Sequence, residues 1–174
     1  LATTSKEHSF MPLWKPKFIT QLAPEDRCHL SGLAMKDGKP AFVTAVSETN
    51  VTDGWREHRG HGGVVIDIAT DDVVCRGLPM PPSPRWHNGK LWLANSGKGE
   101  YGYVDFDTGK LVPIAFCPGF IRGATLHGNY AIVGLSKPRN DTFQGLELDE
   151  RLKKEKVSAR SGLYVIDLTT GATP

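Results

Sequence analysis

Short apolar runs alternate with turn-forming residues along most of the chain, most regularly between positions 83 and 120. Runs of this length that are bounded by Gly, Asn and Asp are typical of β-strands. The expected strands in this stretch are residues 84–86, 91–95, 101–106 and 111–116. The pattern therefore predicts a four-stranded antiparallel meander.

Two other parts of the chain repeat this unit. The strands expected in them are 28–35, 40–46, 63–69 and 73–77 before it, and 123–126, 130–135 and 162–168 after it. The first hairpin of each unit closes on a glycine, which supplies the positive φ of a tight turn. The third strand of each unit ends in an aspartate. These repeated positions are Gly38, Gly89 and Gly128, and Asp67, Asp105 and Asp167.

Three aligned copies of a four-stranded meander predict an all-β protein, a β-propeller of four-stranded antiparallel blades. About three blades fit in the chain, so the ring is expected to be incomplete. An irregular β-sandwich is the alternative. We expect a partial propeller over residues 23–174, with blades at about 27–78, 83–117 and 121–174.

Residues 1–22 are expected to form an N-terminal arm. Pro12 and Pro16 interrupt the apolar run 10–22, and proline is excluded from helix interiors and central strands. The run therefore predicts an edge strand or a strap over the core. Residues 1–9 are polar and are expected to be loose.

Two insertions distinguish the outer units from the central one. The glycine-to-aspartate spacing is 16 residues from Gly89 to Asp105, 29 in the first unit and 39 in the last. Both excess lengths fall between the second and third strands, so both loops should emerge on one face. Residues 146–157 of the second loop combine leucines with i,i+3 and i,i+4 charge pairs and predict a short amphipathic helix. Long loops on a rigid scaffold favour a binding site on that face.

Composition narrows the classes of function. The formal net charge is only +2, which argues against a nucleic-acid partner, and no stretch has the roughly 20 apolar residues of a membrane span. Because residues 1–10 contain no apolar run, no secretory leader is expected from them. Three widely spaced cysteines without a CxxC pair argue against a disulfide framework or a zinc knuckle. We expect free thiols in a reducing compartment and a cytoplasmic location.

The first insertion suggests an anion clamp. Guanidinium groups recognise carboxylates and phosphates, and an indole ring can stack on them; the residues are Trp55, Arg56 and Arg59. A solvated loop is the alternative interpretation. His58 and His61 suggest a metal pair, but no third ligand accompanies them, so no metal site is assigned.

Polar residues near the first strand of each unit should face the central channel. Asn95 ends the second strand of the central unit, on the face that carries the long loops. The further candidate ligand-binding residues are Arg27, His29, Ser31, Ser83, Arg85, Asn95 and Arg122. No nucleotide-binding or catalytic motif is present, so catalytic residues remain unknown. The residues favour a ligand-binding or scaffold propeller that takes a small anionic molecule or a peptide on the long-loop face.

Several blocks, among them LWKPKFI, EDRCHLSGLAM, SPRWHNGKLWLANSGKGEYGYVD and AFCPGFIRG, resemble an uncharacterised bacterial family of predicted β-propellers, a domain of unknown function. The resemblance implies a propeller fold without an assigned activity. Members of that family are longer, which implies that this chain corresponds to their N-terminal half.

The blade pattern is more loosely similar to six-bladed propellers of the lactonase and gluconolactonase kind. That resemblance implies an alternative function, a metal-dependent hydrolase with a divalent cation in the channel. Its Glu, Asn and Asp ligand set does not map onto this chain beyond Asn95. Because three blades cannot close a ring, we also expect a second copy or a missing C-terminal half to complete the propeller.

Overall fold

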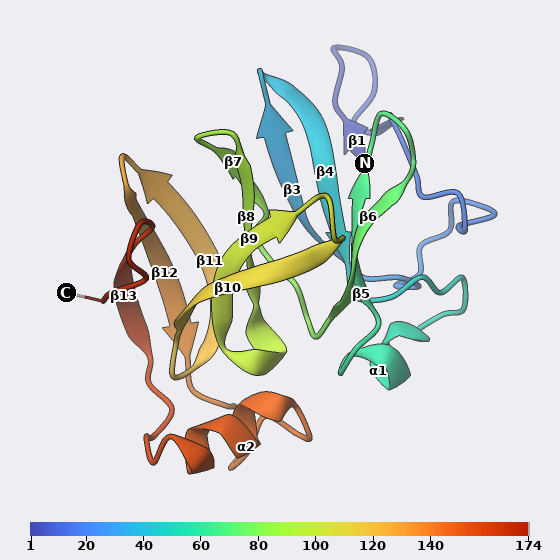
Figure 1. The fold of residues 1–174 in the computed structure, drawn as a ribbon. Helices are drawn as coiled ribbons and strands as arrows, with labels where there is room; N and C mark the ends of the chain where they lie inside the picture. The colour runs from blue at the N-terminus through green and yellow to red at the C-terminus, as the bar shows by residue number, and fades with distance from the viewer. Residues whose placement is uncertain (174) are drawn as a thin grey trace.

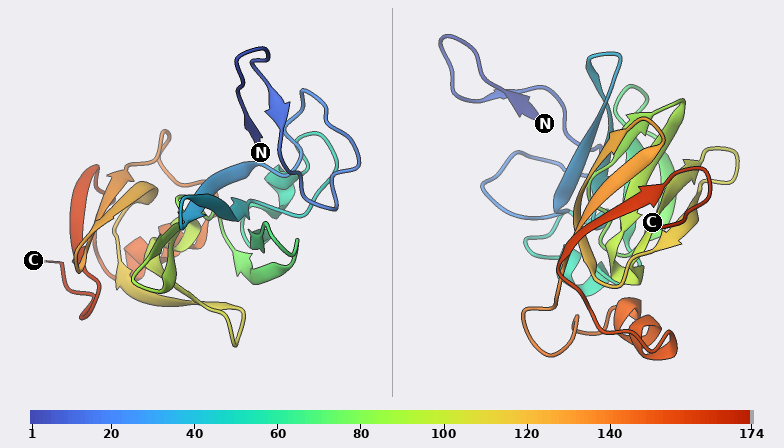
Figure 2. Two further views of the ribbon diagram at one scale, coloured as in Figure 1. Left: turned by 90° about the horizontal axis from the view of Figure 1, so that it is seen from above. Right: turned by 90° about the vertical axis from the view of Figure 1, so that its left-hand side faces the viewer.

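The computed structural model describes residues 1–173. Besides a two-stranded sheet in the N-terminal arm, it contains three antiparallel sheets that fan out side by side in an open arc (Figures 1 and 2). Blade 1 contains β3 (Leu30–Lys36), β4 (Lys39–Ala45), β5 (Gly63–Asp67) and β6 (Val73–Leu78). Blade 2 contains β7 (Arg85–His87), β8 (Lys90–Asn95), β9 (Glu100–Asp105) and β10 (Lys110–Phe116). Blade 3 contains β11 (Phe120–His127), β12 (Tyr130–Ser136) and β13 (Gly162–Asp167).

Neighbouring strands in each blade are consecutive in the chain. This is the up-and-down meander that the repeat predicted, so the all-β propeller fold is confirmed. Blades 1 and 2 have four strands, whereas the sheet of blade 3 has three within the described residues. The ring is not closed.

The repeated aspartates shape the turn that follows each third strand. Asp105 Oδ1 accepts a hydrogen bond from the backbone N–H of Asp107 at 3.0 Å, and Asp167 Oδ1 accepts one from Thr169 at 2.7 Å. The corresponding bond in blade 1 runs from the Ala69 N–H to Asp67 Oδ1 at 2.8 Å. An aspartate carboxylate that accepts the N–H two residues later forms the same kind of ring as a backbone turn. This local role explains why aspartate recurs at this position in each unit.

The innermost strands approach each other closely near the centre of the arc. A Cβ atom on Gly32 of β3 would lie 2.3 Å from Pro84 Cδ and 2.9 Å from the backbone nitrogen of Ser83. Only glycine permits that separation. Gly32 therefore sets how tightly blade 1 packs against blade 2.

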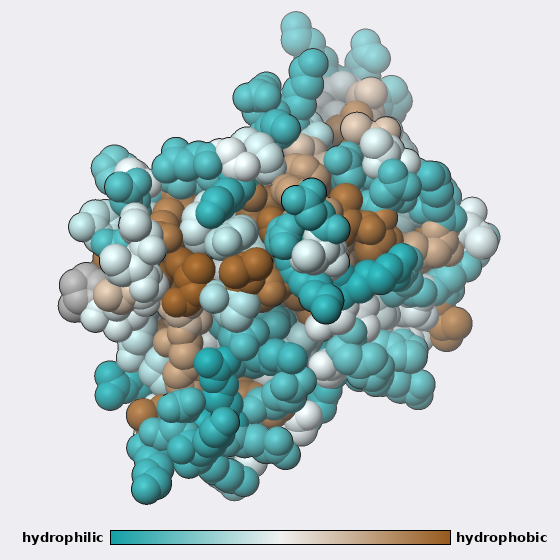
Figure 3. All heavy atoms as spheres, viewed as in Figure 1, coloured by the Kyte–Doolittle hydropathy of each residue, from teal (hydrophilic) through white to brown (hydrophobic). Residues whose placement is uncertain are grey.

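Apolar layers hold the blades together. Phe42, Val65 and Cys75 pack against Leu91 and Leu93 between blades 1 and 2. A second layer, between blades 2 and 3, contains Trp92, Tyr101, Ile121, Val133 and Ile166. Figure 3 shows apolar side chains in a band between the blades, while hydrophilic side chains cover the ends that carry the loops.

The N-terminal arm covers the face of blade 1 that points away from blade 2. Ile19 is buried with Val43 and Ile66, whose neighbours along β4 and β5 face blade 2 instead. Trp14 Nε1 donates a hydrogen bond to Asp71 Oδ1 at 2.7 Å. The arm is thus a strap over the core.

One expectation for the arm was wrong. Residues 1–9 are not all loose, because β1 (Ala2–Thr3) pairs with β2 (Met11–Pro12). In addition, the amino group of Leu1 donates to the carbonyl oxygen of Trp14 at 2.6 Å.

Both long insertions lie at one end of the blades, the lower end in Figure 1. The second contains α2 (Glu147–Lys154), close to the predicted helix, and the first contains the short α1 (Trp55–His58), which the sequence pattern did not predict. Blade 2 has only η1 (Ser96–Lys98), a short 3₁₀ turn, at the same place. None of the helices in residues 1–173 is long and apolar enough to cross a membrane.

The helix α2 does not sit over its own blade alone but also covers η1 of blade 2. A Cβ on Gly99 would lie 2.7 Å from Leu148 Cδ1, and Leu148 is fully buried. Arg151 pairs with Glu100 at 2.8 Å, and Lys98 pairs with Glu147 at 3.3 Å. The second insertion therefore ties blade 3 to blade 2.

Candidate ligand-binding site

A cavity of about 570 Å³ opens at the end of the blades that carries the insertions. Three parts of the chain form it: the starts of inner strands, the first insertion and residues 138–146 of the second insertion. The segment before β3 supplies His29, and the start of β11 supplies Phe120 and Arg122. The first insertion supplies Trp55 and Arg59.

Aromatic rings form much of the wall. The rings of Phe120 and Phe143 stack with their centroids 6.1 Å apart, and those of His29 and Trp55 stack at 4.3 Å. Trp55 is buried although it lies in an insertion. The two stacked pairs give the cavity flat apolar surfaces that suit a planar or apolar group.

Three arginines make the cavity cationic. Arg59, Arg122 and Arg139 all line it, and no Asp or Glu of the described residues does. Within residues 1–173 none of the three takes part in an ion pair. Their charges are therefore available to an anion.

Arg122 is held in place by neutral contacts. Its Nε donates to Ser136 Oγ at 2.9 Å, and its guanidinium lies 4.4 Å from the centre of the Phe120 ring. Burial lowers the pKa of Arg122, and the nearby positive charge of Arg139 lowers it further. Both effects disfavour the charged guanidinium, so a bound anion would relieve them.

Arg59 joins the two insertions. Its guanidinium donates to the backbone carbonyl oxygen of Gln144 at 2.5 Å and approaches Gln144 Oε1 at 3.4 Å. Asp149 fixes the same loop from the other side, because both of its carboxylate oxygens accept the N–H of Phe143 at 2.9 Å. Residues 138–146 are thus anchored around the cavity.

His29 adopts an unusual backbone conformation with φ of 51°. A non-glycine residue in this left-handed region is uncommon and is often found at functional sites. Its Nδ1 lies 2.7 Å from Asp26 Oδ2, which leaves Nε2 as the ring nitrogen available to a ligand. Met80, which also lines the cavity, has φ of 52°.

The structure brings four of the predicted binding residues to this cavity: His29, Trp55, Arg59 and Arg122. Arg56 does not line it, but pairs with Asp53 at 3.0 Å and lies over the outer face of the Trp55 ring. Arg27 does not line this cavity. Its guanidinium donates hydrogen bonds to Glu25 Oε2 at 2.8 Å and to Asn50 Oδ1 at 2.9 Å.

The remaining predicted residues make contacts within the protein. Ser31 Oγ donates to the Pro81 carbonyl oxygen at 2.6 Å, and Arg85 donates to that of Pro84 at 2.9 Å. Ser83 has φ of 54° and lies beside the inner strands. Asn95 is buried and donates from Nδ2 to Glu100 Oε2 at 3.0 Å, and its Oδ1 has no partner among the residues that the structure describes.

Sequence reasoning missed several residues that line the cavity. They are Met80, Phe120, Arg139, Phe143 and Gln144. The basic segment 137–139 was a signal for Arg139, since it begins the second insertion. The sequence contains no comparable signal for Phe143, because its position depends on the bond to Asp149.

No group of three or more His, Cys, Asp or Glu residues in the described part of the chain is placed to hold a metal ion. His58 and His61 lie edge to face with ring centroids 6.1 Å apart, outside this cavity. The lining of the cavity itself supplies arginine side chains and aromatic rings.

The blades and the cavity together define an incomplete β-propeller with a cationic, aromatic-walled cavity at its long-loop end. Residues 1–174 match a family that is described as a domain of unknown function (DUF4915), and the chain belongs to that family. No curated protein matches the sequence.

Solved structures resemble the chain in fold. Hydrazine synthase from Kuenenia stuttgartiensis matches with a TM-score of 0.51 and 15% identity, over 89% of this chain and 37% of that one. The computationally designed Ika4 protein matches with a TM-score of 0.48 and 12% identity, over 87% and 73%. This chain thus spans 37% of the length of the hydrazine synthase chain. At such identities the likeness concerns the fold alone.

Proposed function

We propose that this propeller binds a small anionic ligand, a carboxylate or a phosphate ester with a planar apolar body, in the cavity between its two insertions. The observation that carries the proposal is the convergence of Arg59, Arg122 and Arg139 on one cavity without an acidic residue in its lining. Arg59 is half-buried, whereas Arg122 and Arg139 are exposed at the rim of the cavity. Like charges gathered at one place repel one another, and these three have no carboxylate partner within residues 1–173.

The lining consists of a cationic part and an aromatic part, and this division suggests how such a ligand would be oriented in the cavity. The terminal nitrogens of Arg122 and the neighbouring Arg139 would hold the anionic group, because guanidinium groups form paired hydrogen bonds with carboxylate and phosphate oxygens. The stacked pairs Phe120–Phe143 and His29–Trp55 would receive the apolar body.

The test is calorimetric titration with phenyl phosphate, with phenol as the neutral probe and inorganic phosphate as the anion without a ring. We expect phenyl phosphate to bind more tightly than phenol or inorganic phosphate. Its binding should weaken as the salt concentration rises. Arg122→Gln should weaken its binding about tenfold or more, because a charge-assisted hydrogen bond of about 1.5–3 kcal/mol is lost.

Arg56→Gln is the matched control, since Arg56 belongs to the same insertion as Arg59 but pairs with Asp53 outside the cavity. It should leave binding unchanged. The proposal would be overturned if phenyl phosphate did not bind. It would also be overturned if phenyl phosphate bound the Arg122→Gln variant and the native protein with equal affinity.

A further inference from the structure

Among the described residues that line the cationic cavity, His29 carries the one titratable side chain other than arginine. This part of the lining has no Asp, Glu, Cys, Lys, Ser or Tyr, and the hydroxyl of Thr142 already accepts the backbone N–H of Gln144 at 3.2 Å. A neutral imidazole has a nitrogen with a free lone pair, which makes it a nucleophile. His29 is therefore the residue of this cavity that could react with a bound ligand.

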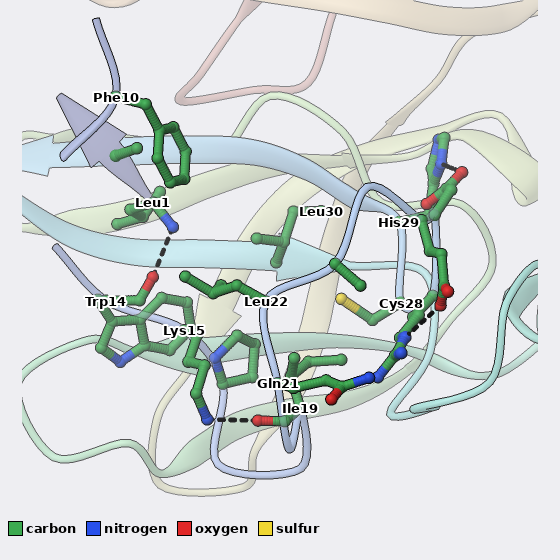
Figure 4. Close-up of a pocket in the computed structure, with 16 residues that line it drawn as sticks. Leu1, Phe10, Trp14, Lys15, Ile19, Gln21, Leu22, Cys28, His29 and Leu30 are labelled. Carbon is green, nitrogen blue, oxygen red and sulfur yellow. Dashed lines mark hydrogen bonds and ion pairs between the residues drawn. The ribbon is translucent and has the colours of Figure 1, made fainter. Parts of the chain in front are cut away.

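Asp26 fixes the tautomer of the His29 ring. Asp26 Oδ2 lies 2.7 Å from His29 Nδ1 (Figure 4). Because an ionised carboxylate can only accept a hydrogen bond, Nδ1 carries the proton and the lone pair of the neutral ring is on Nε2. An aspartate at this position also stabilises a positive charge that develops on the ring during a reaction.

The His29 ring lies between two cavities. His29 and Asp26 both line a second cavity of about 330 Å³, which lies between the arm and the start of β3 (Figure 4). Of these two residues, only His29 also lines the cationic cavity. The Nδ1 side of the ring, which is bonded to Asp26, therefore belongs to the arm side. The part of the ring that carries Nε2 is left to face the cationic cavity.

Packing and backbone conformation restrain the ring further. The indole of Trp55 stacks on it with an interplanar angle of 27°. The φ of 51° places the backbone of His29 in a conformation that costs free energy in a non-glycine residue. A side chain that is held in one orientation has less freedom to lose when it reacts, which lowers the barrier of the reaction.

We propose that the cavity hydrolyses phosphate monoesters with His29 Nε2 as the nucleophile, an inference that rests on the proposed binding of a phosphate ester at Arg122 and Arg139. The lone pair of Nε2 forms a bond to phosphorus while the ester P–O bond breaks, and the electron pair of that bond leaves with the ester oxygen. Water then attacks phosphorus, and the electron pair of the N–P bond returns to Nε2. The leaving oxygen takes up the proton that the water releases, so one ester and one water give one alcohol and one phosphate.

The charges around the cavity suit this reaction. Guanidinium groups neutralise the oxygens of a phosphoryl group as it is transferred, which is the main task of a protein in this chemistry. The phosphorylated ring, still protonated on Nδ1, carries a positive charge beside the Asp26 carboxylate. With the apolar body of the ester against Phe120 and Phe143, the phosphoryl group lies between that body and His29, as an in-line displacement requires.

Release of p-nitrophenolate from p-nitrophenyl phosphate measures the activity, because this leaving group is stable as an anion at neutral pH. His29→Asn is the test variant, since asparagine tolerates a left-handed backbone but its amide is not a nucleophile. It should lower kcat by about 100-fold or more, while calorimetric titration should show that phenyl phosphate still binds.

Asp26→Asn tests the positioning role of the carboxylate. It should lower kcat by about tenfold or more with little change in KM, because an amide does not hold the Nδ1–H tautomer. His61→Gln is the matched control, since His61 belongs to the first insertion and is exposed outside the cavity. It should leave kcat and KM unchanged.

Rapid quenching of the native protein with radiolabelled p-nitrophenyl phosphate tests the covalent step. The trapped label should be lost in acid and kept in alkali, as a phosphorus–nitrogen bond requires, and His29→Asn should trap none. If phenyl phosphate binds but p-nitrophenyl phosphate is not hydrolysed, the catalytic proposal is overturned and the binding proposal stands. Hydrolysis that His29→Asn retains, or hydrolysis without a trapped label, would also overturn the role of His29. A native protein that binds no phenyl phosphate would overturn both proposals.

Discussion

The guanidinium of Arg59 in the first insertion donates a hydrogen bond to the backbone carbonyl oxygen of Gln144 in the second, at 2.5 Å. The two residues are 85 positions apart in sequence. Their contact joins two loops that belong to different blades, at the edge of the cationic cavity. The shape of the cavity therefore depends on a bond between insertions as well as on the sheets.

Replacing Arg59 with Ala should loosen residues 138–146 without unfolding the protein. We expect amide hydrogen exchange in this loop to accelerate about tenfold, since local opening loses a restraint. The free energy of unfolding should change by less than about 1 kcal/mol, because the contact is exposed. Arg56→Ala removes a pair with Asp53 and a contact with the Trp55 ring but no contact with residues 138–146, so it should leave exchange in that loop unchanged.

Replacing Gly32 with Ala should destabilise the protein by about 1–3 kcal/mol, because the new methyl group meets Pro84 and the backbone of Ser83. Gly123 is the matched control on β11, the inner strand of blade 3, where a Cβ would meet only Ser83 Oγ at 3.8 Å. Urea denaturation of both variants measures the difference. Equal midpoints would show that the blades can separate at no cost.

Leu148→Ala should cost about 2–5 kcal/mol, because the side chain is fully buried where α2 covers Gly99. Leu163→Ala, at a site that is 76% exposed, should change stability by no more than about 0.5 kcal/mol. Thermal unfolding of both variants gives the comparison. A small effect at Leu148 would mean that the helix docks through its ion pairs alone.

Stability in acid should depend on the turn aspartates. Two hydrogen bonds lower the pKa of the Asp105 carboxyl. The larger effect comes from the hydroxyl of Thr108 and the smaller from the backbone N–H of Asp107. A lowered folded-state pKa stabilises the protein above the unfolded value of about 3.9, and this contribution is lost as the pH falls through the folded value.

Asp105→Asn removes the charge and should lower the urea midpoint at neutral pH. The gap from the native protein should narrow below about pH 4, as the native carboxyl also becomes neutral. Asp107→Asn is the control, because the Asp107 carboxylate accepts no hydrogen bond within residues 1–173. A gap that does not depend on pH would refute the electrostatic account.

The cysteines should be unreactive in the folded protein. Burial raises the pKa of Cys117 to about 12 and that of Cys75 to about 11, and all three thiols are buried. The thiolate is the reactive form, so modification by a disulfide reagent at pH 8 should be about 100-fold slower than in urea. Rapid reaction of one thiol without urea would reveal local opening at that site.

The blade architecture could be predicted because its turns are local. A glycine with positive φ and an aspartate that binds its own turn act within a few residues, so their recurrence identifies each unit. The helix α1 could not be predicted in this way. Its four residues are too few for an apolar period, and Trp55 is buried there by packing against His29.

The candidate site was only partly predictable for a similar reason. Arg27 and His29 were expected together, but the left-handed backbone at His29 breaks the alternation of an extended strand. The Arg27 side chain is held by Glu25 and Asn50 instead. The position of Phe143 depends on its bond to Asp149, a contact that no local pattern reveals.

The space above η1 in blade 2 is occupied by α2, an element inserted in blade 3. A longer connection between β8 and β9 would have to displace this helix. Loop length in one blade is therefore coupled to loop length in the next. Among related proteins, chains with an extended blade 2 connection should have a shortened second insertion, and with it a cavity of different shape and preference.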